Sequence, residues 1–309
     1  MRLTVAICTR NRAASLERTL ASLVQCAPPE VPWEVVVVDN GSRDTTSTVL
    51  TRFAGRLPLR AIIEDTPGLS RARNAAVRVA RGEYIVWTDD DCVVDQRWLI
   101  EYAAAFNQWP DAAVFGGPIR PSFIDGPPAW LARTATRVAS AFAARDLGPT
   151  PITLSTEQNR LPYGANYAIR AHEQRSRLYD EDLGRGSFLA TLGEESVLME
   201  DLLRQGAVGR WVPNAGVTHC IPPERQRLSY LREYYEAYGA LLEWRNQTGR
   251  HSEDSRDSSS RVSLLKRRLY HGLRFRMLRP IVSEERWIDD FIAGAIAHGR
   301  SKARREPSG

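Results

Sequence analysis

The 309-residue sequence has no long apolar run. No segment approaches the roughly 18 to 20 apolar residues that a membrane-spanning helix needs. The opening residues, MRLTVAICTRNR, contain an apolar run that is too short for a secretory signal and that leads directly into arginines. We therefore expect the chain to start with a β-strand and to be cytoplasmic.

Cysteine is also scarce. Cys8, Cys26, Cys92 and Cys220 lie far apart and show none of the paired spacings of zinc-binding motifs. This pattern argues against a zinc cluster and against a disulfide framework. We expect most of these residues to pack as small apolar side chains, and we assign no chemical role to Cys92, which follows a group of acids.

Basic residues outnumber acidic ones, but the excess is confined to one end of the chain. The net charge is +5 and the pI is about 9.2, a balance that is common in nucleic-acid-binding proteins. From residue 261 onward there are twelve Arg or Lys and five Asp or Glu, so the preceding residues are slightly acidic. Only Lys266 and Lys302 are lysines, which indicates a bias in residue usage. These observations argue against a nucleic-acid partner.

Apolar, β-branched runs alternate with segments of helical periodicity in the first part of the chain. The apolar runs lack polar alternation, which is typical of a parallel sheet covered by helices on both faces. We therefore predict an α/β fold with a mostly parallel central sheet. The strands are expected at 3–9, 34–38, 60–63 and 84–88, and helices at 13–26 and 68–81.

Three polar clusters follow three of these predicted strands. They are Thr9-Arg10-Asn11-Arg12, Asp39-Asn40 and Asp89-Asp90-Asp91. Ligands of open α/β sheets bind beyond the carboxyl ends of the strands. One cleft could therefore collect all three clusters.

The three consecutive aspartates point to a bound cation. Adjacent carboxylates repel one another, and a divalent cation would cancel that repulsion. Mg²⁺ typically binds one or two protein carboxylates and completes its shell with water and substrate phosphates. On an extended chain Asp89 and Asp91 would point to one side and Asp90 to the other. A polar turn is the alternative interpretation, because Asp is common in turns.

Six segments together resemble the family 2 glycosyltransferases, which have the GT-A fold. In chain order they are VAICTRNR, VVVDNGSRD, GLSRARNAAVRVARGEYIVWTDDD, PYGANYAIR, GEES at 193–196 and VTHC. The resemblance covers about residues 1–245. It implies a nucleotide-sugar-binding half at 1–118 and an acceptor-binding half at 119–248. A linker at 249–260 and a basic helical extension at 261–309 are expected to follow.

The resemblance implies that the polar residues at the strand ends bind a nucleoside diphosphate sugar. Thr9 and Arg12 would line the nucleotide pocket, and Asp39 would contact the base. A carboxylate can accept the imide N–H of uracil or thymine, which favours a UDP- or dTDP-linked donor. For Arg71, an exposed helix face is an equally good interpretation. The other expected contacts to the nucleotide, ribose or sugar are Arg71, Asn74, Asp89 and Asp90.

The resemblance also implies a Mg²⁺ or Mn²⁺ ion. Asp91 is the principal candidate ligand, with Asp89 and His219 beside it. A lone histidine is more often structural than a ligand. The match of His219 to the family's histidine after the last core strand nevertheless favours a contact to the metal or the diphosphate.

Two further segments are expected to meet the sugars. Gly164, Ala165 and Asn166 resemble the family's loop at the donor sugar, where glycine lets the backbone come close. Trp130 could stack on an acceptor sugar, or it could simply anchor its own loop.

Glu194-Glu195 stands where the family usually has Glu-Asp, and the second acid of that pair is the general base. Glu195 is therefore the predicted base, although its side chain is one methylene longer than aspartate. Glu194 is the alternative. Stabilisation of a helix N-terminus by acids is compatible with either role.

The function implied is an inverting transfer of a sugar to a hydroxyl of a glycan or lipid-linked acceptor. A non-catalytic nucleotide-sugar-binding protein is one alternative, which Glu195 in place of aspartate keeps open. A nucleotidyltransferase is another, although TRNRAASLER lacks the Gly-rich basic loop usual in that class. The basic, leucine-rich segment 261–279 could lie on the inner face of an anionic membrane, or it could pack with its basic face in solvent.

Overall fold

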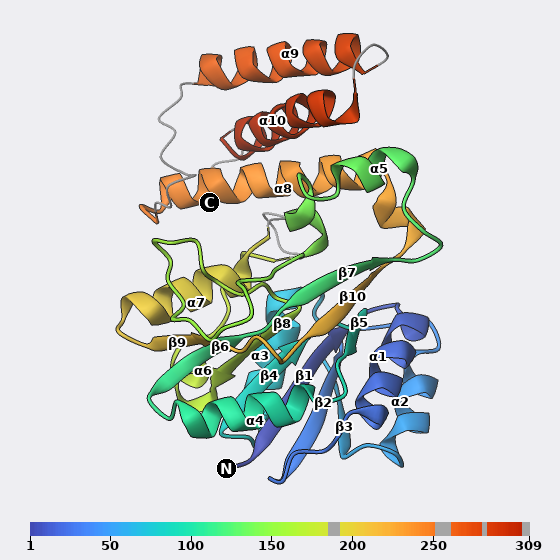
Figure 1. The fold of residues 1–309 in the computed structure, drawn as a ribbon, viewed down its shortest axis with the longest axis vertical. Helices are drawn as coiled ribbons and strands as arrows, with labels where there is room; N and C mark the ends of the chain where they lie inside the picture. Colours follow the sequence, from blue (N-terminus) through green and yellow to red (C-terminus); the bar gives the residue numbers. More distant parts are fainter. Residues whose placement is uncertain (185–191, 251–260, 280–282, 305–309) are drawn as a thin grey trace. The chain divides into compact units, whose positions relative to one another are not determined.

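A computed structural model describes residues 1–184, 192–250, 261–279 and 283–304. The chain forms two compact units, each with its own hydrophobic core. The first unit contains Met1–Ser122, the segment that begins at Ala143, and Gly193–Cys220, and the second contains Phe123–Phe142 and Ile221–Gly309 (Figure 1). Most of the predicted linker, residues 251–260, lies outside the described residues.

The first unit is built on a seven-stranded sheet with the order β3-β2-β1-β4-β8-β6-β9. β1 is parallel to both β2 and β4, β2 is parallel to β3, and β6 is parallel to β9. Only β8 runs antiparallel to its neighbours β4 and β6. The predicted α/β class with a mostly parallel central sheet is thereby confirmed. The strands are β1 Leu3–Thr9, β2 Trp33–Asp39, β3 Leu59–Ile63, β4 Tyr84–Thr88, β6 Ala112–Gly116, β8 Asn166–Arg170 and β9 Val208–Trp211.

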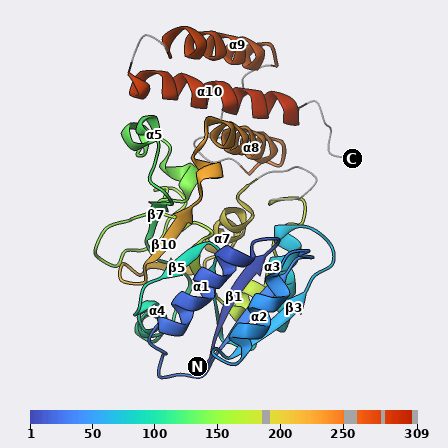
Figure 2. The same cartoon turned by 90° about the vertical axis from the view of Figure 1, so that its right-hand side faces the viewer.

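Helices cover both faces of this sheet (Figures 1 and 2). In β1, Leu3, Val5 and Ile7 enter the core on one face, and Ala6 enters the core on the other. The first core also contains side chains of α1, α2 and α4, and the second contains side chains of α3 and α7. Burial of both faces is why the strands show no polar alternation. These helices are α1 Ala13–Gln25, α2 Thr46–Ala54, α3 Leu69–Val79, α4 Trp98–Gln108 and α7 Glu194–Arg204, and a short helix, α6 Ala171–Ser176, follows β8.

A second, three-stranded sheet has the order β5-β10-β7, with β5 Cys92–Val94, β7 Ile119–Phe123 and β10 Val217–Ile221. β5 and β10 are antiparallel, and His219 is the register partner of Cys92. The amide of Cys220 donates to the carbonyl of Asp91 (2.8 Å). This pairing brings His219 to the acids that follow β4.

The second unit is helical, and its helices pack around one apolar cluster that includes Leu131, Phe142, Leu231, Trp287 and Phe291. A Cβ at Gly299 would lie only 1.9 Å from the Glu236 carbonyl, so glycine permits close packing of α10 on α8. Within the described ranges, none of the helices is both long and apolar enough to cross a membrane. The elements are α5 Ala129–Thr134, η1 Ala139–Phe142, η2 Pro223–Gln226, α8 Leu228–Gln247, α9 Arg261–Leu278 and α10 Glu284–Ala303.

Candidate active site

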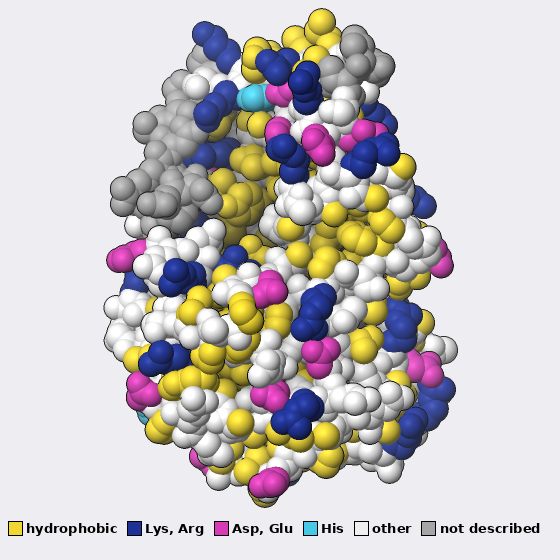
Figure 3. Space-filling view, in the orientation of Figure 1, with side chains coloured by type: hydrophobic (Ala, Val, Ile, Leu, Met, Phe, Trp, Pro, Cys, Tyr) yellow, Lys and Arg dark blue, Asp and Glu magenta, His cyan; other side chains and the backbone are white. Residues whose placement is uncertain are grey.

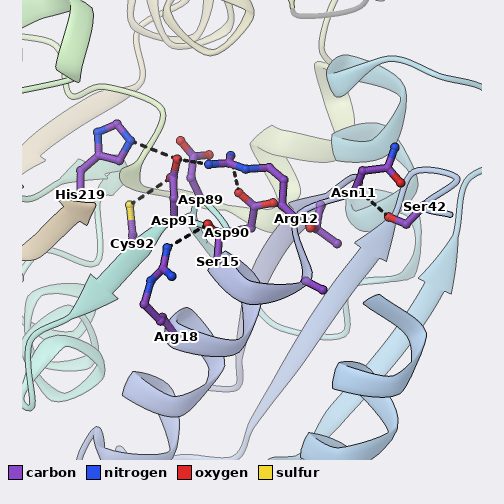
Figure 4. A network of polar contacts seen from close by, with 12 residues as sticks. Asn11, Arg12, Ser15, Arg18, Ser42, Asp89, Asp90, Asp91, Cys92 and His219 are labelled. Carbon is purple, nitrogen blue, oxygen red and sulfur yellow. Dashed lines mark hydrogen bonds and ion pairs between the residues drawn. The ribbon is translucent and has the colours of Figure 1, made fainter. Parts of the chain in front are cut away.

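The three aspartates lie on a tight turn between β4 and β5, and two of them share one arginine (Figure 4). The guanidinium of Arg12 donates to Asp90 Oδ1 (2.7 Å) and to Asp91 Oδ2 (2.7 Å). Thr9 Oγ1 donates to the other oxygen of Asp90 (2.7 Å). Residues from the end of β1 thus neutralise and orient the acids at the end of β4, as expected where parallel strands end side by side.

The electrostatics of Asp90 reflect its deep burial. Desolvation raises the pKa of Asp90 to about 7, and the neighbouring Asp91 carboxylate adds to this, while Arg12 opposes it. The same arrangement raises the pKa of the Arg12 guanidinium through Asp90 and Asp91, despite its partial burial. Arg12 therefore offsets the repulsion between Asp90 and Asp91 and holds both side chains in place.

Asp91 faces a histidine from a different strand. Its Oδ2 lies 3.3 Å from His219 Nε2, and both side chains are buried. A carboxylate oxygen and an imidazole nitrogen this close together could share one divalent cation. Within the part of the chain that the structure describes, no group of three or more His, Cys, Asp or Glu side chains is arranged to hold a metal. A cation held by Asp91 and His219 would take its remaining ligands from water and substrate phosphates.

Asp89 pairs with a different arginine. Its Oδ1 lies 3.7 Å from Nη2 of Arg73, and its side chain is 39% exposed, the most accessible of the three acids. An extended chain would have grouped Asp89 with Asp91, but the structure groups Asp90 with Asp91. The reason is that the amide of Cys92 donates to the Asp89 carbonyl (3.3 Å), which bends the backbone into a turn.

Arg73 is the central cation of a second cluster, and no sequence motif singled it out. It is buried on α3, where it hydrogen-bonds Glu194 through Nη1 and lies 3.6 Å from Glu195 Oε2. Its guanidinium also lies over the ring of Tyr179, 5.5 Å from the centroid. Burial opposes the charge of Arg73, but Tyr167 and the carboxylates of Glu194 and Glu195 raise its pKa. Arg73 therefore stays charged and links Asp89 to the two glutamates.

Glu194 and Glu195, at the start of α7, have different environments. Glu194 is almost fully buried and forms the hydrogen-bonded ion pair with Arg73. Glu195 is more accessible, with 15% of its side chain exposed. Burial, followed by the charge of Glu194, raises the pKa of Glu195 to about 7, and Arg73 partly offsets this. A carboxylate that titrates near neutral pH is suited to act as a general base.

The predicted sugar loop is divided between the site and the core. A Cβ at Gly164 would lie 3.0 Å from Glu195 Oε1 and 3.1 Å from Arg73 Nη2, so glycine leaves room at the site. Ala165 is buried and its carbonyl accepts from Thr88 Oγ1 (3.0 Å). The structure does not bring the Asn166 side chain to the site. Its amide is buried and bonded to Trp98, Tyr102 and the carbonyls of Pro118 and Ala215.

Of the remaining predicted contacts, Thr9 and Asp39 lie side by side as register partners at the ends of β1 and β2. Arg71 is partly exposed and pairs with Glu181 (2.9 Å). Asn74 is buried and holds the backbone of Tyr179 through both ends of its amide. The structure therefore assigns the Asn74 side chain to the support of the loop around 179–181.

One buried asparagine organises the neighbouring loop and was not predicted. Asn40 Nδ2 donates to the carbonyls of Glu64 and Thr66 (both 2.8 Å), and its Oδ1 accepts from the amide of Gly68 (2.8 Å). Asn40 thus fixes the loop that leads into α3. The Asp39-Asn40 pair at a strand end was the sequence signal for it.

Trp130 belongs to the helical unit. Its ring is partly buried and packs against the core of that unit, with its centroid 6.2 Å from that of Trp287. This contact supports the interpretation that Trp130 anchors α5.

Replacing Arg73 by methionine is expected to destabilise the first unit by about 3 kcal/mol at neutral pH, because it leaves buried carboxylates unpaired. The loss should shrink as the pH falls through about 7, where Glu195 takes up a proton. Thermal unfolding of the two proteins across this pH range measures the difference. Arg73→Lys is the matched control that keeps the charge, and a loss independent of pH would contradict the assigned role.

A model of the family described as "Glycosyl transferase family 2" matches residues 4–169 of the chain. A hyaluronan synthase of Pasteurella multocida is 31% identical over 116 residues, 37% of this chain and 12% of the relative. A validoxylamine A glucosyltransferase of Streptomyces hygroscopicus subsp. jinggangensis is 33% identical over 105 residues, 33% of this chain and 25% of the relative. The matches thus span a quarter or less of these two relatives.

Solved structures share the fold at low sequence identity. The mannosyltransferase PcManGT of Pyrobaculum calidifontis, in complex with GDP-Man and Mn²⁺, superposes with a TM-score of 0.59 at 18% identity. That match covers 96% of this chain and 86% of the other. S. aureus TarS 1-349, in complex with UDP-GlcNAc, gives a TM-score of 0.53 at 15% identity over 99% of this chain and 92% of the other. These similarities confirm the GT-A type of fold.

Proposed function

Because the chain belongs to glycosyl transferase family 2, we propose that it transfers a sugar from a nucleoside diphosphate sugar to an acceptor hydroxyl. One observation carries this proposal. Arg73 lies 3.7 Å from Asp89 and 3.6 Å from Glu195, so the acids of the β4–β5 turn adjoin the candidate base. Such an arrangement suits a displacement in which the diphosphate leaves a carbon atom while the incoming hydroxyl attacks the same atom.

The nucleotide is proposed to lie over the ends of β1 and β2. Thr9 and Asp39 are neighbours there, and the Asp39 carboxylate is held by the amide of Ser42 (2.9 Å). A fixed carboxylate can accept the imide N–H of uracil or thymine, which supports a UDP- or dTDP-linked donor. TarS was solved in complex with UDP-GlcNAc, whereas PcManGT was solved in complex with GDP-Man.

Asp91 and His219 are the proposed protein ligands of a Mg²⁺ or Mn²⁺ ion. PcManGT was solved with Mn²⁺, and the paired Asp91 and His219 side chains have donor atoms that suit such an ion. When bound, the cation would supply positive charge that stabilises the departing diphosphate. Arg12, which donates to Asp91 at 2.7 Å, keeps this carboxylate oriented.

Glu195 is the proposed general base. It accepts the proton of the acceptor hydroxyl as the hydroxyl oxygen forms a bond to the anomeric carbon. The bond from that carbon to the diphosphate oxygen breaks, and the diphosphate leaves with the electron pair. Attack opposite the leaving group inverts the anomeric configuration. The raised pKa of Glu195 favours an enzyme over a non-catalytic sugar-binding protein.

The acceptor is proposed to be a hydroxyl of a glycan or of a lipid-linked acceptor. Support comes from the relatives, which include a hyaluronan synthase and a poly(ribitol-phosphate) β-N-acetylglucosaminyltransferase. The matched segments cover only part of these proteins. The acceptor is therefore inferred only from the kind of reaction that the names of these relatives describe.

Proton NMR of the products tests this function. The chain is incubated with UDP-, dTDP- and GDP-linked sugars, Mn²⁺ and a panel of glycan acceptors. We expect the transferred or released sugar to appear with an inverted anomeric configuration, and to appear fastest with a UDP- or dTDP-linked donor. A retained configuration would contradict the proposed displacement, and inactivity with every donor would contradict the proposed function.

A further inference from the structure

Helix α9 has two apolar faces, and only one of them is buried in the second unit. Phe275 packs its ring against Trp287 (5.5 Å between centroids) and Phe291 (5.2 Å) of α10. Leu264, about three turns earlier and on the same side, is 1% exposed. This face holds α9 on the helical unit.

The opposite face of α9 carries a row of exposed apolar side chains. Leu265, Leu269, Leu273 and Met277 recur at every fourth residue and are 41%, 56%, 58% and 67% exposed. Side chains four residues apart are neighbours on a helix, so they form one stripe about 18 Å long. With Tyr270 they make up five of the seven exposed large hydrophobic side chains among the described residues. Such a concentration marks an interaction surface, since scattered single residues would need no explanation.

Positive charge surrounds this stripe. α9 contains Lys and Arg but no Asp or Glu. At 3.6 residues per turn, Lys266 and Arg276 lie on the same half of the helix as the stripe. Both are exposed. Figure 3 shows basic and hydrophobic side chains side by side over α9.

We propose that α9 docks the protein on a membrane surface that contains anionic phospholipid. Leucines can enter the boundary between headgroups and acyl chains while arginines bind lipid phosphates, and long basic side chains reach outward to do so. A second copy of the chain is a poor occupant, because it would bring two acid-free basic helices face to face. The proposal does not depend on the proposed sugar transfer, since it concerns a surface formed entirely by the second unit.

Vesicle flotation of the full chain tests the proposal. We expect binding to vesicles of phosphatidylcholine mixed with phosphatidylglycerol, little binding to phosphatidylcholine alone, and weakening with added salt. The double variant Leu269→Glu/Leu273→Glu should bind at least about tenfold more weakly. Lys266→Glu/Arg276→Glu should lose the preference for the anionic lipid. Both pairs are exposed, so thermal unfolding should match the parent.

Ile63→Glu is the matched control. Ile63 is also an exposed apolar residue, at 72%, but it ends β3 in the first unit, so this variant should float like the parent. Equal flotation of the leucine variant and the parent would overturn the proposal, as would equal binding to neutral and anionic vesicles. A dimer that the leucine variant dissociates, seen by light scattering without vesicle binding, would assign the stripe to a second copy instead.

Discussion

Glu195→Gln is expected to lower the rate of sugar transfer by about a thousandfold, within the range attributed to a positioned general base. The amide keeps the size of the side chain but cannot accept a proton. In the parent, kcat/KM should rise with pH and level off above about 7, because the base works only when deprotonated and its pKa is about 7. Initial rates of transfer or donor hydrolysis across the pH range measure both effects.

Glu194→Gln is the matched control for this substitution. The charge of Glu194 raises the pKa of Glu195. Glu194 also accepts a hydrogen bond that Arg73 donates. Its removal should therefore lower the pKa of Glu195 and move the rising limb of the profile to lower pH, with substantial activity retained. The opposite result, near-parental activity in Glu195→Gln and the larger loss in Glu194→Gln, would assign the base to Glu194.

Asp91→Asn is expected to lower activity by about a hundredfold or more and to remove the dependence of nucleotide binding on Mn²⁺. A metal that stabilises the leaving group lowers the activation free energy by several kcal/mol. Each 1.36 kcal/mol of activation free energy is a factor of ten in rate. Loss of the carboxylate removes the group that faces His219 at 3.3 Å. Rates measured over a series of Mn²⁺ concentrations check this expectation.

Asp90→Asn separates the metal role of Asp91 from its ion pair with Arg12. Asp90 shares Arg12 but makes its second hydrogen bond with Thr9 and not with His219. Arg12 and Thr9 donate to different oxygens of Asp90, so an asparagine oxygen can keep only one of the two bonds. Because the Arg12–Asp91 ion pair is left in place, we expect less than about a tenfold loss and an unchanged Mn²⁺ requirement. If both variants lose activity equally and keep their response to Mn²⁺, then Asp91 serves Arg12 and not a metal.

The sheet was predictable because its strands β1, β2 and β4 are buried on both faces. The run at 3–9 forms β1, and the run EVVVV forms the middle of β2, Trp33–Asp39. Polar residues that follow such runs had to leave the core, and parallel strands end at one edge. That reasoning was enough to place Thr9, Asp39 and the aspartates together.

The two arginines that neutralise the acids could not be chosen from composition. The repulsion among three aspartates suggested a divalent cation, yet Arg12 already pairs with two of them. On α3, Arg73 is four residues before Val77, on the buried side of the helix, whereas Arg71 is partly exposed. Helical phase could therefore have singled out Arg73, but the acids that make its burial favourable come from α7, more than a hundred residues later.

Asn166 shows the limit of an argument from motifs. Its place after Gly164-Ala165 suggested a sugar contact, but its backbone belongs to β8, between β4 and β6. There the side chain meets Trp98 and Tyr102 of α4. Which way a residue points at the first position of a strand depends on register, and the sequence does not specify the register.

Isothermal titration of the chain with UDP, with and without Mn²⁺, is the most direct test of the acid cluster as a diphosphate site. The account predicts clear heat of binding when Mn²⁺ is present and at least about tenfold weaker affinity when it is removed by chelation. Parallel titrations with dTDP and GDP cover the other bases. If none of the three nucleotides binds more tightly with Mn²⁺ than without it, the assignment of Asp91 and its neighbours is contradicted.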